Sequence, residues 1–204
     1  MPKIAENARA RKTKLIRVAF DVIATEGVSA CTFRRLAEAA NTSTRPFTHA
    51  FGTRAAMLRE VAFSTWQRTD IDLMADAGPI ERPSTWDCID ELVATGRNWL
   101  PLTPTQAQTE RVYLEIVLYS LNDPVLHGEL NGHSLRANAH VQALVEEGQR
   151  RGQLRSDLLA ADLVMAFWSY QEGLAFCHLH EPNALSIETL ARLWESGVRS
   201  LLQA

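Results

Sequence analysis

The sequence predicts an all-α protein of about nine helices, with a small N-terminal domain followed by a larger C-terminal one. Apolar residues recur three and four positions apart along most of the chain, which is the spacing of one helix face. No segment shows the alternation of a half-buried strand between turns, and no internal repeat is found. Apolar residues make up 46% of the 204 residues and charged residues 22%, which is typical of a globular chain rather than a disordered or fibrous one.

Four helices are predicted in the first part of the chain, each bounded by residues that start or stop helices. Gly27 and Gly52 follow two of them, and Asn41, which tolerates left-handed backbone, ends another. Thr32 and Thr53 are expected N-caps, because their hydroxyls accept from free backbone N–H groups. The predicted ranges are 10–26, 33–41, 44–50 and 54–76.

Five further helices are predicted in the rest of the chain. Ser84 is the expected N-cap of the first, and Pro101, Pro124, Gly152 and Pro182 lie in the breaks that follow. The predicted ranges are 84–100, 105–121, 125–151, 157–180 and 186–203.

The net charge of -3 conceals a difference between the two parts of the chain. Residues 1–60 contain 11 Lys and Arg against 5 Asp and Glu, whereas the remainder contains 10 against 19. A basic N-terminal segment favours contact with a polyanion, because neutralised phosphates release condensed counterions. A solvated basic tail is the alternative, since six of these charges lie between Lys3 and Arg17.

Apolar segments and cysteines bear on where the protein works. No apolar run reaches about 18 residues, and no signal-peptide core follows the basic N-terminus. Cys31, Cys88 and Cys177 are far apart and lack CxxC spacing, which favours reduced and mostly buried thiols. We therefore expect a cytoplasmic protein that does not enter a membrane.

Catalytic motifs are missing from the sequence. There is no GxSxG, HExxH or glycine-rich phosphate loop and no evident nucleophile and base pair, so we expect no enzyme activity, catalytic residue or cofactor. Cys177, His178 and His180 lie close together, but adjacent helix residues point about 100° apart and cannot converge on a metal unless the helix has ended. We predict no metal site, and a metal- or thiol-responsive regulator using these residues is kept as an alternative.

Residues 41–54, NTSTRPFTHAFGTR, place a proline among hydroxyl residues, arginines and a histidine. Two short helices joined by a tight turn, the second carrying such polar residues, have the layout of a helix-turn-helix. With Ser43 as N-cap, Pro46 falls in the first turn, where N–H groups lack intrahelical partners and proline is tolerated. The first residues of such a helix reach base edges in a major groove about 12 Å wide.

Residues 15–61, LIRVAFDVIATEGVSACTFRRLAEAANTSTRPFTHAFGTRAAMLREV, resemble the N-terminal DNA-binding domain of the TetR family of transcriptional regulators, without a gap. The resemblance rests on the joint spacing of Ala19, Gly27, Thr32, Leu36, Ala37, Ala40, Ser43, Phe47, Phe51, Gly52, Arg54 and Leu58. It implies a helix-turn-helix domain over 1–52 and a helical effector-binding and dimerisation domain over 53–204. It further implies a homodimer, most often a repressor, that leaves a pseudo-palindromic double-stranded DNA operator when a small apolar or amphipathic molecule binds. A non-specific helical DNA-binding protein is the alternative.

The sequence departs from the family pattern inside the helix-turn-helix. Asn41 stands where a glycine is usual, and Ala50 where an aromatic residue is common. Pro46 and Thr48 replace a threonine and a tyrosine that commonly touch phosphate in the family. Two usual backbone contacts are therefore missing, and the operator is hard to infer from the family.

The resemblance and helix geometry together predict which side chains meet DNA. Arg45 is predicted to contact guanine O6 and N7, with phosphate contact or plain solvation as the alternatives. Thr44 and Thr48 are predicted to meet a thymine methyl, and His49 and Arg54 to bind phosphates. The full set is Thr32, Arg34, Ser43, Thr44, Arg45, Thr48, His49 and Arg54.

Aromatic and apolar side chains of the C-terminal part either line an effector pocket or fill an ordinary helical core. The pocket candidates are Trp99, Tyr113, Tyr119, Met165, Trp168 and Phe176. One polar stripe is formed by Arg111, Glu115, Tyr119 and Asn122. It is either a solvated face with an Arg111–Glu115 pair or a set of polar contacts to an effector. The last two helices supply apolar area for dimerisation, and Gly173 would permit close helix approach. The interface candidates are Phe167, Tyr170, Gly173, Leu174, Leu190, Trp194 and Leu201.

Overall fold

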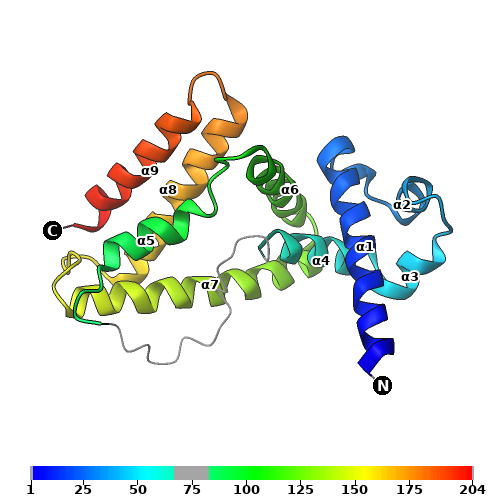
Figure 1. The fold of residues 1–204 in the computed structure, drawn as a ribbon, viewed down its shortest axis with the longest axis horizontal. Helices are drawn as coiled ribbons and strands as arrows, with labels where there is room; N and C mark the ends of the chain where they lie inside the picture. Colours follow the sequence, from blue (N-terminus) through cyan, green and yellow to red (C-terminus); the bar gives the residue numbers. More distant parts are fainter. Residues whose placement is uncertain (1, 67–82, 204) are drawn as a thin grey trace. The chain divides into compact units, whose positions relative to one another are not determined.

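A computed structural model describes residues 2–66 and 83–203, and all the regular structure within those ranges is helical (Figure 1). The all-α prediction is confirmed. The elements are α1 (Pro2–Glu26), the 3₁₀ helix η1 (Val28–Ala30), α2 (Phe33–Ala39), α3 (Arg45–Phe51), α4 (Arg54–Trp66), α5 (Cys88–Arg97), α6 (Pro104–Ser120), α7 (Pro124–Arg150), α8 (Ala160–His180) and α9 (Ile187–Leu202).

Most predicted boundaries agree with the structure, and the differences have local causes. Asp87, not Ser84, caps α5, because Asp87 is extended and its carboxylate accepts from the backbone N–H of Asp90 at 2.9 Å. Thr44, not Ser43, is the N-cap of α3. The first helix reaches back to Pro2 rather than to about residue 10. Residues 67–76 of the helix predicted over 54–76 lie outside the described residues.

The chain divides into two compact units. The N-terminal unit comprises residues 1–68 and 111–131, and the C-terminal unit comprises residues 69–110 and 132–204. The N-terminal unit therefore contains α1–α4 together with most of α6. The domain division at residue 52 remains a prediction.

The core of the N-terminal unit joins all four of its first helices. The α1 residues Phe20 and Ile23, Leu36 of α2, Phe47 of α3 and Leu58 of α4 are fully buried. A fully buried side chain of this size stabilises a fold by about 1.5–3 kcal/mol. The short helices α2 and α3 are too short to be stable alone, so this shared core holds them in place.

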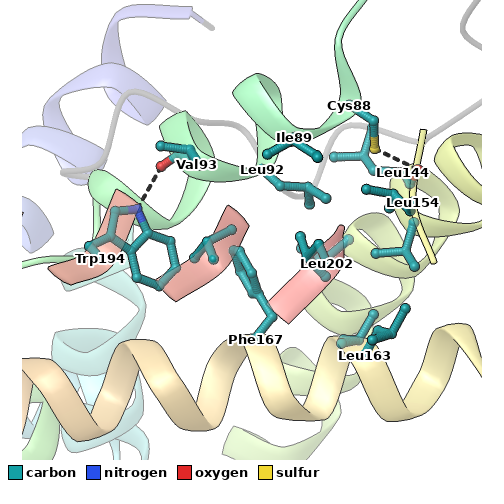
Figure 2. Packing of buried hydrophobic residues seen from close by; sticks show 14 of the residues in the cluster. Cys88, Ile89, Leu92, Val93, Leu144, Leu154, Leu163, Phe167, Trp194 and Leu202 are labelled. Atoms are coloured by element: carbon teal, nitrogen blue, oxygen red, sulfur yellow. Dashed lines mark hydrogen bonds between the residues drawn. The ribbon is translucent and has the colours of Figure 1, made fainter. Parts of the chain in front are cut away.

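The core of the C-terminal unit is built from α5, α7, α8 and α9 (Figure 2). Trp194 of α9 is fully buried in this core, and its indole Nε1 donates to the carbonyl oxygen of Val93 at 2.8 Å. The ring of Phe167 packs against Trp194 with 5.2 Å between centroids. Cys88 contributes to the same core, and its Sγ donates to the carbonyl oxygen of Leu144 at 3.2 Å.

Gly96 of α5 is required by this packing. A Cβ added at Gly96 would lie 2.1 Å from Cζ2 of Trp194 and 2.9 Å from Cζ of Phe167. Because both rings are fully buried, neither can move away cheaply. We expect Gly96→Ala to lower the free energy of unfolding by about 2–3 kcal/mol, measured by urea denaturation followed by tryptophan fluorescence.

Gly132→Ala is the matched control for Gly96→Ala. Gly132 lies inside α7, and nothing is within 4 Å of a Cβ added there. Alanine favours helix over glycine by about 0.8–1 kcal/mol, so this variant should be slightly more stable than the parent. Similar stability of the two variants would show that the Gly96 contact is not a close one.

No helix in the described part of the chain is both long and apolar enough to span a membrane.

Candidate nucleic-acid interface

The turn between α2 and α3 has the geometry of a helix-turn-helix. Asn41 adopts φ of 48°, the left-handed conformation predicted for it. The backbone N–H of Thr42 donates to the carbonyl oxygen of Ala37 at 2.9 Å, and that of Asn41 donates to Glu38 at 3.1 Å. These two bonds form a Schellman motif, which ends α2 sharply and directs the chain into α3.

Pro46 lies in the first turn of α3, as predicted, although the helix begins one residue later than expected, at Arg45. Pro46 is the second residue of the helix, and the carbonyl that its ring would approach belongs to Thr42, outside the helix. The carbonyl oxygen of Thr44 accepts from the N–H groups of Phe47 at 3.1 Å and Thr48 at 3.0 Å. Ser43 is exposed and lies in the turn.

Helix α3 has one buried and one exposed face. Phe47 and Phe51 are buried, whereas Thr44, Arg45, Thr48 and His49 are exposed. Neither Arg45 nor His49 makes a hydrogen bond or ion pair with any residue that the structure describes. The exposed side chains predicted to meet DNA are therefore presented together on a helix that its own aromatic residues fix in place.

Helix α2 adds two of the predicted DNA-contacting residues. Thr32 is its N-cap, and its Oγ1 accepts from the backbone N–H of Arg35 at 3.2 Å. The side chain of Arg34 is 90% exposed, and its single ion pair is long, with 3.9 Å between its Nε and Oε1 of Glu38. The neighbouring Arg35 differs, because its Nε donates to Glu26 at 2.8 Å in a two-point ion pair. Arg34 is thus the arginine of α2 that is available to DNA.

Arg54, predicted to bind phosphate, is used inside the protein. Its Nε donates to the carbonyl oxygen of Cys31 at 2.9 Å and its Nη2 to that of Val28 at 2.6 Å. Its Nη1 donates to the hydroxyl of Tyr119, whose ring centroid lies 4.6 Å from the guanidinium carbon. Because these contacts join η1, α4 and α6, we assign Arg54 a positioning role in place of a phosphate contact.

Two residues of α6 that the sequence did not assign to DNA binding support the helix-turn-helix. Tyr119 was a pocket candidate and instead holds Arg54. The carboxylate of Glu115 accepts from the backbone N–H of Val28 at 2.7 Å, beside Gly27, whose φ is 84°. Glu115 also lies 3.6 Å from Arg111, as one alternative for the polar stripe predicted. A side chain 87 positions away from its backbone partner gives no local sequence signal.

The basic segment of α1 is only partly available to a polyanion. Lys12 pairs with Glu60 at 2.9 Å, and Arg17 pairs with Asp21 at 3.1 Å. Arg9 and Lys14 are exposed. Part of the positive charge counted in the sequence is thus neutralised inside the N-terminal unit.

The six pocket candidates occupy different environments. Trp99 and Trp168 lie together in the C-terminal unit, with ring centroids 6.3 Å apart. Met165 is 61% exposed and Phe176 is 55% exposed, so both lie on the outer surface of α8. Tyr113 and Tyr119 belong to the N-terminal unit.

Most of the dimer candidates are used within one chain. Phe167, Leu190 and Trp194 are fully buried in the core of the C-terminal unit, because the apolar faces of α8 and α9 pack on each other and on α5. Tyr170 donates its hydroxyl proton to the carbonyl oxygen of Leu193 at 2.7 Å. Leu174 and Leu201 are half-buried against the same core.

Within one chain the close approach of α8 to α9 occurs at Gly197, whereas the role of Gly173 in a dimer stays a prediction. A Cβ added at Gly197 would lie 2.2 Å from Oη of Tyr170, whereas nothing is within 4 Å of one added at Gly173. Sequence alone does not distinguish the two, because either glycine lies on a helix of the right length.

The cysteine and histidine group on α8 does not converge. The Nδ1 of His178 hydrogen-bonds with the carbonyl oxygen of Leu185 at 2.7 Å, and the ring of His180 stacks on Phe176 at 5.7 Å. Cys177 is exposed. Among the residues described, no three His, Cys, Asp or Glu side chains are grouped so as to hold a metal ion.

Comparisons with known proteins agree with this geometry. Residues 15–61 match the family of bacterial regulatory proteins called the tetR family. No match was found among curated protein sequences. Three solved structures share the fold over nearly their whole length. The first is a Rhodococcus sp. protein assigned as a TetR-family transcriptional regulator, with 15% identity and a TM-score of 0.80 over 94% of this chain and 98% of that chain. The second is a Saccharomonospora viridis protein assigned as a transcriptional regulator, in complex with choline, with 18% identity and a TM-score of 0.75 over 94% of this chain and 96% of that chain. The third is the MbdR regulator of Azoarcus sp. CIB, with 20% identity and a TM-score of 0.67 over 92% of this chain and 96% of that chain.

The helix-turn-helix with its exposed polar face and the matched domain define a DNA-binding transcriptional regulator. The match to the tetR family covers residues 15–61, and solved structures such as the TetR-family regulator of Rhodococcus sp. share the fold of the chain as a whole. Members of that family combine a DNA-binding head with a helical body and are generally not enzymes.

Proposed function

We propose that the protein is a homodimeric repressor that binds a pseudo-palindromic operator through α3. It dissociates from the operator when a small molecule binds the C-terminal unit. The observation that carries the DNA-binding part is the exposed polar face of α3 opposite buried Phe47 and Phe51. Dimeric helix-turn-helix proteins with two-fold symmetry place two such helices in successive major grooves. The DNA-contacting set is Thr32, Arg34, Ser43, Thr44, Arg45, Thr48 and His49.

Arg45 is proposed to read a guanine. It is the first residue of α3, it is exposed, and its guanidinium is not engaged by the part of the chain described. We expect Arg45→Ala to weaken operator binding by about 1–3 kcal/mol, or roughly 5- to 150-fold, and to relax the preference at one base pair in each half-site. Fluorescence anisotropy with an operator selected from a random DNA pool measures both effects.

The control for Arg45→Ala is Arg150→Ala, which removes an exposed arginine of α7 in the C-terminal unit. It should leave operator affinity unchanged. If Arg45→Ala weakens binding to all sequences equally, and the slope of log affinity against log salt concentration becomes shallower by about one, Arg45 contacts a phosphate instead. Unchanged affinity and preference would remove Arg45 from the interface.

Dimerisation is proposed to use the outward face of α8. Met165, Gly173 and Phe176 share that face and are exposed in the single chain, and Gly173 leaves room for a second helix. Exposed large apolar side chains grouped on one surface mark an interaction site. A monomeric mass in solution by light scattering would contradict this.

The effector part of the proposal rests on the fold and on the choline complex of the Saccharomonospora viridis regulator. A ligand that binds better to one conformation changes DNA affinity by the same factor by which DNA changes ligand affinity. Operator affinity that stays identical with and without a bound small molecule would refute induction.

A further inference from the structure

Glu110 of α6 is a buried carboxyl group without a partner. It is only 7% exposed, and it makes no hydrogen bond or ion pair with any part of the chain that the structure describes. Burying an ionised carboxylate without a partner is strongly unfavourable, so such groups are normally paired or protonated. Burial and, to a smaller extent, the negative charge of Glu172 together raise the pKa of Glu110 to about 8.

Two tryptophans of the C-terminal unit are connected to Glu110 through Glu172 of α8. Glu172, which acts on Glu110 by its charge, is one helical turn from Trp168 on the same side of α8. Trp99 packs edge-on against Trp168, and the amide of Gln171 donates to the carbonyl oxygen of Trp99 at 3.0 Å. The acidic-aromatic cluster therefore consists of Trp99, Glu110, Trp168 and Glu172.

The two indoles of the cluster also have unused donors. The Nε1 atoms of Trp99 and Trp168 are buried, and neither has a hydrogen-bond partner in the part of the molecule described. A buried tryptophan N–H usually donates a hydrogen bond, and burying it without an acceptor costs about 1–3 kcal/mol. The cluster thus offers two carboxyl groups, which a bound cation would stabilise in the ionised form, and unsatisfied N–H donors at the same time.

This combination selects the chemistry of a ligand. Carboxylates and indole faces both attract an ammonium group, and a desolvated cation–π contact contributes about 2 kcal/mol. The free indole donors require an acceptor such as a hydroxyl or carbonyl oxygen. A hard metal ion is disfavoured, because Ca²⁺ takes six to eight oxygen ligands and Mg²⁺ takes six.

We propose that the acidic-aromatic cluster binds a small organic ammonium ion that carries an oxygen acceptor, and that this cation is the effector of the regulator. The ammonium group lies against Glu110 and Glu172, and its oxygen accepts from an indole N–H. The proposal rests on the proposed function for the effector role, whereas cation binding itself does not depend on it.

The test compares two probes of nearly identical shape on the full chain. Choline is a quaternary ammonium alcohol, and 3,3-dimethylbutan-1-ol is its uncharged isostere, with carbon in place of nitrogen. Both are titrated by calorimetry into the parent protein, Glu110→Gln and Glu146→Gln. The last removes an exposed glutamate of α7 whose carboxylate accepts from Gln142, so it controls for net charge.

We expect choline to bind the parent and Glu146→Gln alike, and to bind Glu110→Gln at least tenfold more weakly. The uncharged alcohol should bind all three proteins equally and at least tenfold more weakly than choline binds the parent. Equal binding of the two probes to the parent overturns the proposal. So does the absence of saturable binding of choline, tetramethylammonium and acetylcholine at millimolar concentration.

A separate measurement distinguishes this inference from the proposed function. Operator affinity is measured by anisotropy with and without saturating choline. Loss of DNA affinity in the parent and its retention in Glu110→Gln support the effector role. Cation binding without a change in DNA affinity removes that role and leaves the site. Failure to bind any selected DNA, with cation binding intact, refutes the proposed function instead.

Discussion

Replacing Arg54 by alanine is expected to lower the stability of the N-terminal unit by about 4 kcal/mol. The guanidinium donates to the carbonyl oxygens of Val28 and Cys31 and to the hydroxyl of Tyr119. A hydrogen bond from a charged donor is worth about 1.5–3 kcal/mol, and truncation removes one partner from each of these acceptors. The effect should exceed that of any single exposed arginine of the same unit.

The consequence of losing Arg54 extends to DNA binding, although we assign it no contact with DNA. Val28 and Cys31 lie in the connection between α1 and α2, and Arg54 is the first residue of α4. Without the guanidinium, α2 and α3 lose one of the ties that fix their position. Operator affinity should therefore fall together with stability, and the salt dependence of the remaining binding should keep its slope.

Urea denaturation followed by far-ultraviolet circular dichroism measures the stability of Arg54→Ala. Arg54→Lys separates charge from shape, because lysine cannot donate as a planar fork to three acceptors, and it should recover only part of the loss. Arg34→Ala is the matched control, since its 90% exposed side chain should change stability by less than about 0.5 kcal/mol. An unchanged stability of Arg54→Ala with a shallower salt dependence would restore the phosphate role.

The helix-turn-helix could be predicted from sequence because its determinants are local. Asn41, Thr32 and Pro46 each act within four residues of their own position, through a left-handed turn, an N-cap and a first-turn proline. The prediction was wrong by one residue at Ser43, because the N-cap Thr44 makes no side-chain cap hydrogen bond and no hydroxyl therefore determines where α3 begins. Local rules thus fix the existence and the order of these helices better than their exact ends.

The side-chain roles that could not be predicted depend on contacts between distant segments. Arg54 was assigned to phosphate, and nothing near it in sequence indicates Tyr119, 65 positions away. Trp194 lies on an apolar helix face that suits a dimer interface equally well, and its bond to Val93 spans 101 positions. In the sequence, Glu110 has the features of an ordinary polar residue of an amphipathic helix, and only the structure shows that its carboxyl group is buried.

Raising the pH from about 5 to about 9 is expected to destabilise the C-terminal unit through Glu110. The pKa of its carboxyl group is about 8 in the folded protein and near the ordinary value of 4.5 in the unfolded chain. Between these values the folded state holds a proton that unfolding releases, so stability falls as the pH rises through this window. At 1.36 kcal/mol per pH unit, the loss approaches about 5 kcal/mol as an upper bound.

Glu110→Gln isolates this contribution, because an amide stays neutral at every pH and keeps the shape of the protonated carboxyl group. The difference in unfolding free energy between Glu110→Gln and the parent, from tryptophan fluorescence in urea, should grow as the pH rises from about 5 to about 8. Glu146→Gln should keep the slope of the parent, since that glutamate is exposed. Glu172→Gln should move the midpoint of the loss to lower pH, because it removes the neighbouring negative charge. Parallel stability curves for the parent and Glu110→Gln would show that Glu110 titrates normally.

Saturating choline should reduce the loss of stability above about pH 8, because a bound cation stabilises the ionised carboxylate of Glu110 in the folded state.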